Sequence, residues 1–115
     1  MDPITRIVHA GQELDAAYNS ITAPLYQTSV FRYEALGESK GYEYSRASNP
    51  TRDILESLIS DLEGGVGAVA CATGVATFST VLAAFDGNIH LIVSHDFYGG
   101  AARLLGLMQG QGKLT

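Results

Sequence analysis

The order of secondary-structure elements predicted from residue 49 onward constrains the fold of this chain most strongly. Asn49 and Pro50 are a preferred N-cap and a preferred first helical residue, and Gly64-Gly65 is typical of a helix end. After this amphipathic helix, apolar runs and turn residues predict a strand, a helix, a strand and a helix at 66–71, 75–85, 89–93 and 101–108. This βαβ order indicates an α/β fold with a mainly parallel sheet.

Residues 1–48 lack such periodicity. They contain Pro3, Pro24 and scattered Gly and Tyr, which predict an extended arm that reaches a partner rather than a packed unit. Residues 49–115 then begin the sheet domain. Two strands are too few for a sheet covered on both faces, and 113–115 would open a third strand. We therefore expect these residues to be the N-terminal portion of a larger protein.

The composition excludes several functional classes. With a net charge of −5 over 115 residues, a nucleic-acid surface is not expected, because phosphate neutralisation needs an excess of Lys and Arg. The single cysteine, Cys71, rules out an internal disulfide and a CxxC metal site, and we expect it in the core as a reduced thiol. His9, His90 and His95 lack a metal-ligand spacing. Without a membrane-length apolar run or a signal peptide, the sequence predicts a cytoplasmic protein with no membrane partner.

The segment Tyr44-Ser45-Arg46 places an aromatic hydroxyl and a guanidinium two residues apart, directly before the helix start. Both groups donate hydrogen bonds, and the planar guanidinium matches the oxygens of a phosphate. The segment therefore predicts an anion-binding loop braced by a helix. Arg52 falls on the polar face of that helix, which we expect to be solvated.

A second candidate anion site lies at the start of the predicted helix 75–85. The backbone N–H groups of Gly74 and Val75 are free to bind a phosphate there, although ordinary turn chemistry also explains a Thr-Gly pair. The segment is neither a P-loop nor a GxGxxG fingerprint, which disfavours a generic nucleotide binder.

A third candidate is Tyr98, which precedes Gly99-Gly100 at the carboxyl end of the second predicted strand. Open α/β sheets bind ligands at this edge, so the ring is a candidate to stack on a planar cofactor. The alternative is a half-buried packing residue followed by a glycine loop.

In this order and spacing, the three segments resemble the transsulfuration family, the pyridoxal-phosphate (PLP) enzymes of cysteine and methionine metabolism. The resemblance covers nearly the whole chain, and Thr5-Arg6, His9-Ala10-Gly11, Pro24 to Ser29, Asn49 to Arg52, Leu62 to Gly65 and His95-Asp96 also match family signatures. It implies the N-terminal part of a PLP fold-type I, aminotransferase-like subunit, with an arm over 1–48 that contacts a neighbouring subunit and the start of the large domain over 49–115.

The resemblance also implies roles for single residues. Tyr44 and Arg46 would bind the cofactor phosphate of the adjacent subunit, in trans. The backbone amides of Gly74 and Val75 would bind the cofactor phosphate of their own subunit. Tyr98 would stack on the cofactor ring and take part in proton transfer, which makes it the catalytic candidate of the chain. The partners implied are small amino-acid substrates and further copies of the chain, as a dimer of dimers.

Within the family, the segment 94–100 looks most like cystathionine γ-synthase, which joins an O-acylhomoserine to cysteine by γ-replacement. Glu43 matches a position that is acidic in γ-synthases and γ-lyases, and it is either a substrate-specificity residue or an exposed loop carboxylate. The alternatives are cystathionine γ- or β-lyase and O-acetylhomoserine sulfhydrylase.

The Schiff-base lysine of the family is not among these residues, because neither Lys40 nor Lys113 matches its position. We therefore expect residues 1–115 alone to be inactive. A rival of another class is a non-catalytic interaction module that docks on a full-length relative.

Overall fold

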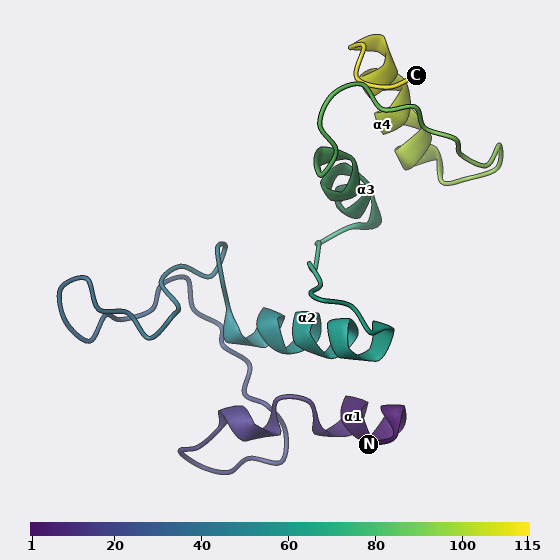
Figure 1. Cartoon of the computed structure of the whole chain (residues 1–115). Helices are drawn as coiled ribbons and strands as arrows, with labels where there is room; N and C mark the ends of the chain where they lie inside the picture. Colours follow the sequence, from purple (N-terminus) through teal and green to yellow (C-terminus); the bar gives the residue numbers. More distant parts are fainter. The chain divides into compact units, whose positions relative to one another are not determined.

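The computed structural model describes the backbone of all 115 residues and every side chain except that of Leu14. The helical elements are α1 (Pro3–His9), the 3-10 helix η1 (Gln12–Leu14), α2 (Pro50–Glu63), α3 (Gly74–Ala83) and α4 (Gly99–Gly110), all visible in Figure 1. The chain forms two compact units, Met1–Ala70 and Cys71–Thr115.

In the first unit, α1 lies beside α2 (Figure 1). The Asp2 carboxylate caps α1 by accepting from the amides of Ile4 and Thr5, and Arg6 joins α1 to α2 through an ion pair of 2.8 Å with Asp61. The expectation of an unpacked arm is therefore wrong for the first 14 residues, which are largely helical. The compact units also divide after residue 70 rather than after 48, because α2 packs with the residues that precede it. Contact of 1–48 with a neighbouring subunit stays a prediction.

The helix predicted from Asn49 is confirmed as α2. The Asn49 side chain accepts from the amide of Thr51 at 2.9 Å, Pro50 occupies the first turn, and Gly64 ends the helix with a φ of 65°. These capping contacts lie within a few residues in sequence, which is why the sequence predicts both ends of α2 correctly.

A short antiparallel pairing precedes α2. Val30 forms a bridge with Tyr44, and the flanking bonds run from Phe31 N to Glu43 O at 2.9 Å and from Ser45 N to Ser29 O at 3.0 Å. Tyr44 therefore lies on a backbone that is held by a neighbouring segment.

The second unit packs α3 and α4 together around Leu82, Leu105 and Leu114. Residues 89–91 pair in parallel with 113–115, through Ile89 N to Lys113 O at 3.2 Å, Thr115 N to Ile89 O at 2.8 Å and Leu91 N to Thr115 O at 2.9 Å. The parallel pairing and the strand-like role of 113–115 agree with the sequence prediction, and the helices predicted at 75–85 and 101–108 are confirmed as α3 and α4.

The strand predictions are wrong in extent. Residues 66–71 have no strand conformation, and the strand predicted at 89–93 is reduced to a single bridge at Ile89. A strand needs a partner for its backbone groups, and none of the described residues pairs with 66–71. Cys71 is only partly buried, with its sulfur 3.5 Å from the Thr80 hydroxyl, so it is not a core residue. Among the described helices, none has the length and apolar character that a membrane span requires.

Candidate functional site

The predicted anion-binding loop brings its two candidate ligands into direct contact. An Nη2 of Arg46 donates to the Tyr44 hydroxyl at 2.6 Å, and the guanidinium carbon lies 5.3 Å from the centre of the Tyr44 ring. Both side chains are exposed, and among the described residues the Arg46 guanidinium has no other hydrogen-bond acceptor. Its remaining N–H donors are therefore available to an incoming anion.

The loop backbone is held from several sides. The amides of Ala47 and Ser48 both donate to the Tyr44 carbonyl, at 2.9 and 3.0 Å, which closes a turn over 44–48. The Ser45 hydroxyl donates to the carbonyl of Thr28, and the side-chain nitrogen of Asn49 donates to the Ser45 hydroxyl at 3.0 Å. Tyr44 and Arg46 are thus exposed side chains on an anchored backbone, a combination that lowers the conformational cost of binding.

Arg52 is the residue at this loop that the sequence prediction missed. It is half-buried rather than solvated, because its guanidinium donates to the carbonyls of Ser45 at 3.2 Å and Ala47 at 2.6 Å. One signal in the sequence points to such a role. An arginine in the first turn of a helix faces the positive end of the helix dipole, so it needs compensating contacts elsewhere.

The second candidate element is the N-terminus of α3. Thr73 caps this helix through its hydroxyl, which accepts from the Ala76 amide at 3.1 Å. Within the described part of the chain, the amides of Gly74 and Val75 have no acceptor, so they stay free at the positive end of the helix dipole.

Tyr98 occupies the position before the first residue of α4, with 73% of its surface exposed. A Cβ atom on Gly100 would lie 2.5 Å from Cε1 of the ring, so the ring rests against Gly100 and would have to shift if that residue carried a side chain. This is the arrangement expected of a ring with one open face. The exposure makes Tyr98 available for stacking and disfavours the packing alternative.

Glu43 points toward a neighbour on the paired segment. Its carboxylate, as a nearby hydrogen-bond acceptor and negative charge, raises the pKa of Tyr33 above its usual value, and loss of solvation adds to the effect. Glu43 itself is exposed. Its role in substrate specificity stays a prediction.

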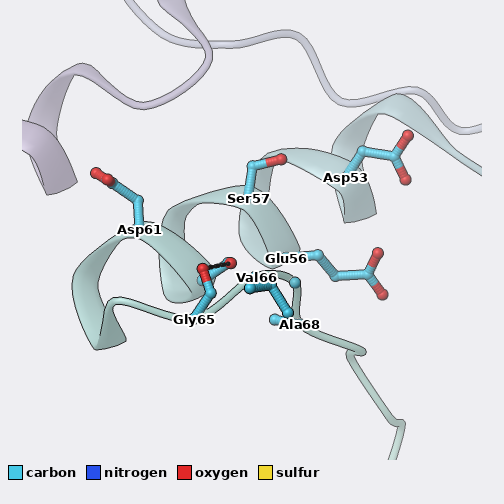
Figure 2. A pocket seen from close by; sticks show the side chains of 9 residues that line it. Asp53, Glu56, Ser57, Asp61, Gly65, Val66 and Ala68 are labelled. Carbon is cyan, nitrogen blue, oxygen red and sulfur yellow. Dashed lines mark hydrogen bonds between the residues drawn. The ribbon is translucent and has the colours of Figure 1, made fainter.

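A cavity of about 560 Å³ lies along α2 and the segment 65–68, and Figure 2 shows it from close by. Three carboxylates line it, and each already has a partner: Asp53 accepts from Tyr42, Glu56 from the Ala70 amide, and Asp61 pairs with Arg6, all at 2.8 Å. Their negative charge opposes phosphate binding. Among the described residues, no cluster of three or more His, Cys, Asp or Glu side chains is arranged to hold a metal ion.

The predicted site residues thus form two groups. Glu43, Tyr44 and Arg46 belong to the first unit, and Gly74, Val75 and Tyr98 to the second. Within the first group the structure joins Tyr44 to Arg46 directly. Within the second, the two amides at the start of α3 have no acceptor and Tyr98 is exposed at the start of α4.

Known proteins share this sequence and this fold. Residues 4–114 match the family described as Cys/Met metabolism PLP-dependent enzymes. A cystathionine beta-lyase of Lactococcus lactis is 45% identical over 101 residues, which cover 88% of this chain and 27% of the lyase. A cystathionine gamma-synthase/O-acetylhomoserine (thiol)-lyase of Bacillus subtilis is 38% identical over 100 residues, which cover 87% of this chain and 27% of that protein.

Among solved structures, the cystathionine gamma synthase of Xanthomonas oryzae pv. oryzae in complex with cystathionine superposes with a TM-score of 0.90 and 36% identity. The match covers 100% of this chain and 30% of that protein. The chain thus spans less than a third of the length of these relatives, and its fold is that of the N-terminal part of a PLP fold-type I subunit. By sequence and by fold, the chain belongs to the family of PLP-dependent enzymes of cysteine and methionine metabolism.

Proposed function

We propose that this chain supplies the phosphate-binding groups of a PLP-dependent enzyme that acts on carbon–sulfur bonds of amino acids. The observation that carries the proposal is the contact between Tyr44 and Arg46, an exposed hydroxyl and guanidinium with unused donors on an anchored loop. The residues fit the cofactor, because a phosphate dianion needs several donors and at least one positive charge.

In this proposal, Arg46 gives two charge-assisted hydrogen bonds to phosphate oxygens and Tyr44 adds a neutral one. The free amides of Gly74 and Val75 bind the phosphate at the positive end of the α3 dipole. Tyr98 covers one face of the planar ring and exchanges a proton through its hydroxyl near the substrate. The cofactor, when bound, supplies an electron sink for the carbon that loses a proton.

We also propose that the two groups of ligands serve different sites. Tyr44 and Arg46 reach the cofactor of a neighbouring copy, whereas Gly74, Val75 and Tyr98 serve the cofactor of their own subunit. This arrangement needs at least a homodimer.

The reaction that we favour is γ-replacement on an O-acylhomoserine by cysteine, as in cystathionine γ-synthase. Its support is the segment 94–100, the acidic Glu43 and the TM-score of 0.90 to the Xanthomonas oryzae synthase. A second candidate is cystathionine β-lyase activity, because the identity to the Lactococcus lactis lyase is 45%.

Phosphate recognition is tested with pyridoxine 5′-phosphate, which carries the phosphate but has no aldehyde to react with Lys40 or Lys113. Calorimetry should show that the chain binds pyridoxine 5′-phosphate and does not bind unphosphorylated pyridoxine. Arg46→Ala should weaken binding at least about tenfold, the loss expected for charge-assisted hydrogen bonds. Arg32→Ala, which removes an exposed arginine of the same unit, should leave the affinity unchanged. Equal binding of the two compounds would reject the proposal.

The reaction is tested in a chimera in which residues 1–115 replace the matching segment of the Xanthomonas oryzae synthase. The chimera should form cystathionine from an O-acylhomoserine and cysteine, and Arg46→Ala in it should lower that activity. A chimera that instead cleaves cystathionine would favour the β-lyase candidate.

A further inference from the structure

Arg52 makes an unusual set of contacts for a residue in the first turn of a helix. Its Nη1 donates to the carbonyl of Ser45 at 3.2 Å and lies 3.5 Å from that of Arg46, and its Nη2 donates to the carbonyl of Ala47 at 2.6 Å. Its Nε lies 3.6 Å from a carboxylate oxygen of Glu56. Three consecutive carbonyls of the anion-binding loop are therefore directed at one guanidinium.

Consecutive carbonyls point the same way in a helical turn, and those at its carboxyl end carry the partial negative charge of unpaired acceptors. Residues 44–48 form such a turn, because the amides of Ala47 and Ser48 both donate to the Tyr44 carbonyl. A planar guanidinium with several donors suits this end, since one side chain can satisfy several acceptors at once. A lysine ammonium, as a point charge, does so less well.

We propose that Arg52 is a positioning residue that locks the turn 45–47 and thereby holds Tyr44 and Arg46 in place for a phosphate. This inference rests on the proposed function, because it assumes that Arg46 binds phosphate. Arg52 is not itself a third phosphate ligand. Its donors are directed at loop carbonyls and at Glu56, and only 31% of its side chain is exposed.

The carboxylate of Glu56 holds the guanidinium of Arg52 on the Nε side. Its side chain is 23% exposed, and the same carboxylate oxygen that faces Arg52 accepts from the Ala70 amide at 2.8 Å. Figure 2 shows Glu56 projecting from α2 near Val66 and Ala68. As an i,i+4 partner, Glu56 also offsets the unfavourable position of Arg52 at the positive end of the α2 dipole.

The test compares Arg52→Lys and Arg52→Gln with Arg46→Ala in the full chain, using pyridoxine 5′-phosphate as the probe. Both Arg52 variants should weaken binding to a similar extent, about three- to tenfold, because neither retains the guanidinium fork. Amide hydrogen exchange at Ala47 and Ser48 should accelerate in both variants, while the amides in the middle of α2 keep their protection. Circular dichroism should show unchanged helix content, since Arg52→Lys keeps the charge and the loss of a cation from the first turn in Arg52→Gln does not weaken a helix.

The outcomes separate the two ideas. If Arg46→Ala has no effect on binding, the proposed function of the loop fails, and the positioning role fails with it. If Arg46→Ala weakens binding but Arg52→Lys binds as tightly as the unmodified chain, only the positioning role is overturned, because charge rather than the fork is then sufficient.

Loss of helix content in the Arg52 variants would call for a second variant, Glu56→Gln. It keeps an acceptor for the Ala70 amide and removes the charge that faces Arg52. Binding about twofold weaker, with faster exchange at Ala47 and Ser48, would support the proposal. Unchanged binding and exchange in this variant would overturn it.

Discussion

Gly11 lies in a crowded part of the first unit, directly after α1. Its φ is +75°, and a Cβ atom built on it would meet Ile54 Cδ1 of α2 at 2.8 Å and Ala23 Cβ at 3.0 Å. A side chain at this position is therefore disfavoured twice, by backbone conformation and by packing.

Gly11→Ala should lower the free energy of unfolding of the first unit by about 2–4 kcal/mol, the sum of left-handed backbone strain and overpacking. Gly37→Ala is the matched control, because Gly37 has a φ of +79° and a Cβ atom added to it would meet no other atom within 4 Å. It should cost only the backbone part, about 1–2 kcal/mol. Urea unfolding followed by helix content measures both, and equal losses would show that the contact with Ile54 is unimportant.

A pH dependence follows from Tyr42, whose hydroxyl donates to Asp53 at 2.8 Å. That hydrogen bond, followed by burial and the charge of Asp53, raises the pKa of Tyr42 above its usual value of 10.0. Because the folded pKa exceeds the unfolded one, the stabilisation is fully present below about pH 10 and is lost as pH rises through the folded pKa.

Stability measured from about pH 8 to about pH 12 should therefore fall less steeply above about pH 10 in Tyr42→Phe than in the unmodified chain. Tyr18→Phe removes a hydroxyl from a ring that is 89% exposed and should keep the original pH profile. Identical profiles for all three proteins would mean that the bond to Asp53 contributes no pH-dependent stability.

At the scale of elements, the start of α2 connects the helix to the anion-binding loop. Asn49 caps the helix with its side-chain oxygen, while its side-chain nitrogen donates to the Tyr26 carbonyl at 3.1 Å and to the Ser45 hydroxyl at 3.0 Å. The Asn49 side chain thus caps α2 with its oxygen and joins Tyr26 and Ser45 to the start of the helix with its nitrogen.

Asn49→Ala should lower the stability of the first unit by about 1 kcal/mol for the cap alone, with a further loss from the two donated bonds. Asn49→Asp keeps the capping oxygen and places a negative charge at the positive end of the dipole, so it should recover the capping part only. Thermal unfolding monitored by helix content should show that the unmodified chain is the most stable, Asn49→Asp is less stable and Asn49→Ala is the least stable. An Asp variant no more stable than the Ala variant would contradict the capping role.

Whether the sequence predicts an element depends on whether that element is stabilised by local or by distant contacts. The ends of α2 and the start of α3 depend on residues within a few positions, so local patterns predict them. The sequence also predicts that Tyr44 and Arg46 share one loop, whereas their direct contact is seen only in the structure. The strand prediction at 66–71 is wrong because apolar composition predicts a strand only where a distant segment supplies the pairing. The position of Arg52 in the first turn of a helix indicates that it needs compensating contacts, but the partners depend on the direction of backbone carbonyls, which the sequence does not record.

At the scale of the whole chain, little apolar surface is buried. The buried hydrophobic side chains of the core are Leu82, Ala101, Leu105 and Leu114, whereas large residues such as Leu36 and Val66 are completely exposed among the described residues. Since burial of apolar surface is the main source of folding free energy, we expect these 115 residues to be marginally stable.

When a protein is only marginally stable, a ligand that binds only its folded state adds a large fraction to its free energy of unfolding. At a concentration about one hundred times its dissociation constant, pyridoxine 5′-phosphate should raise the free energy of unfolding by about 2.7 kcal/mol. Unphosphorylated pyridoxine should have no effect, and a tenfold loss of affinity in Arg46→Ala should lower the stabilisation to about 1.4 kcal/mol. A stabilisation of equal size in Arg46→Ala would place the binding groups outside the anion-binding loop.

The parallel pairing of 89–91 with 113–115 also sets an order of events during synthesis. Ile89 and Leu91 emerge from the ribosome well before the partners that satisfy their backbone groups, and α4 lies between the two segments. Until 113–115 arrive, an apolar edge is open to pairing with other chains. Slow translation through α4 would therefore lengthen the period in which the nascent chain is prone to aggregate.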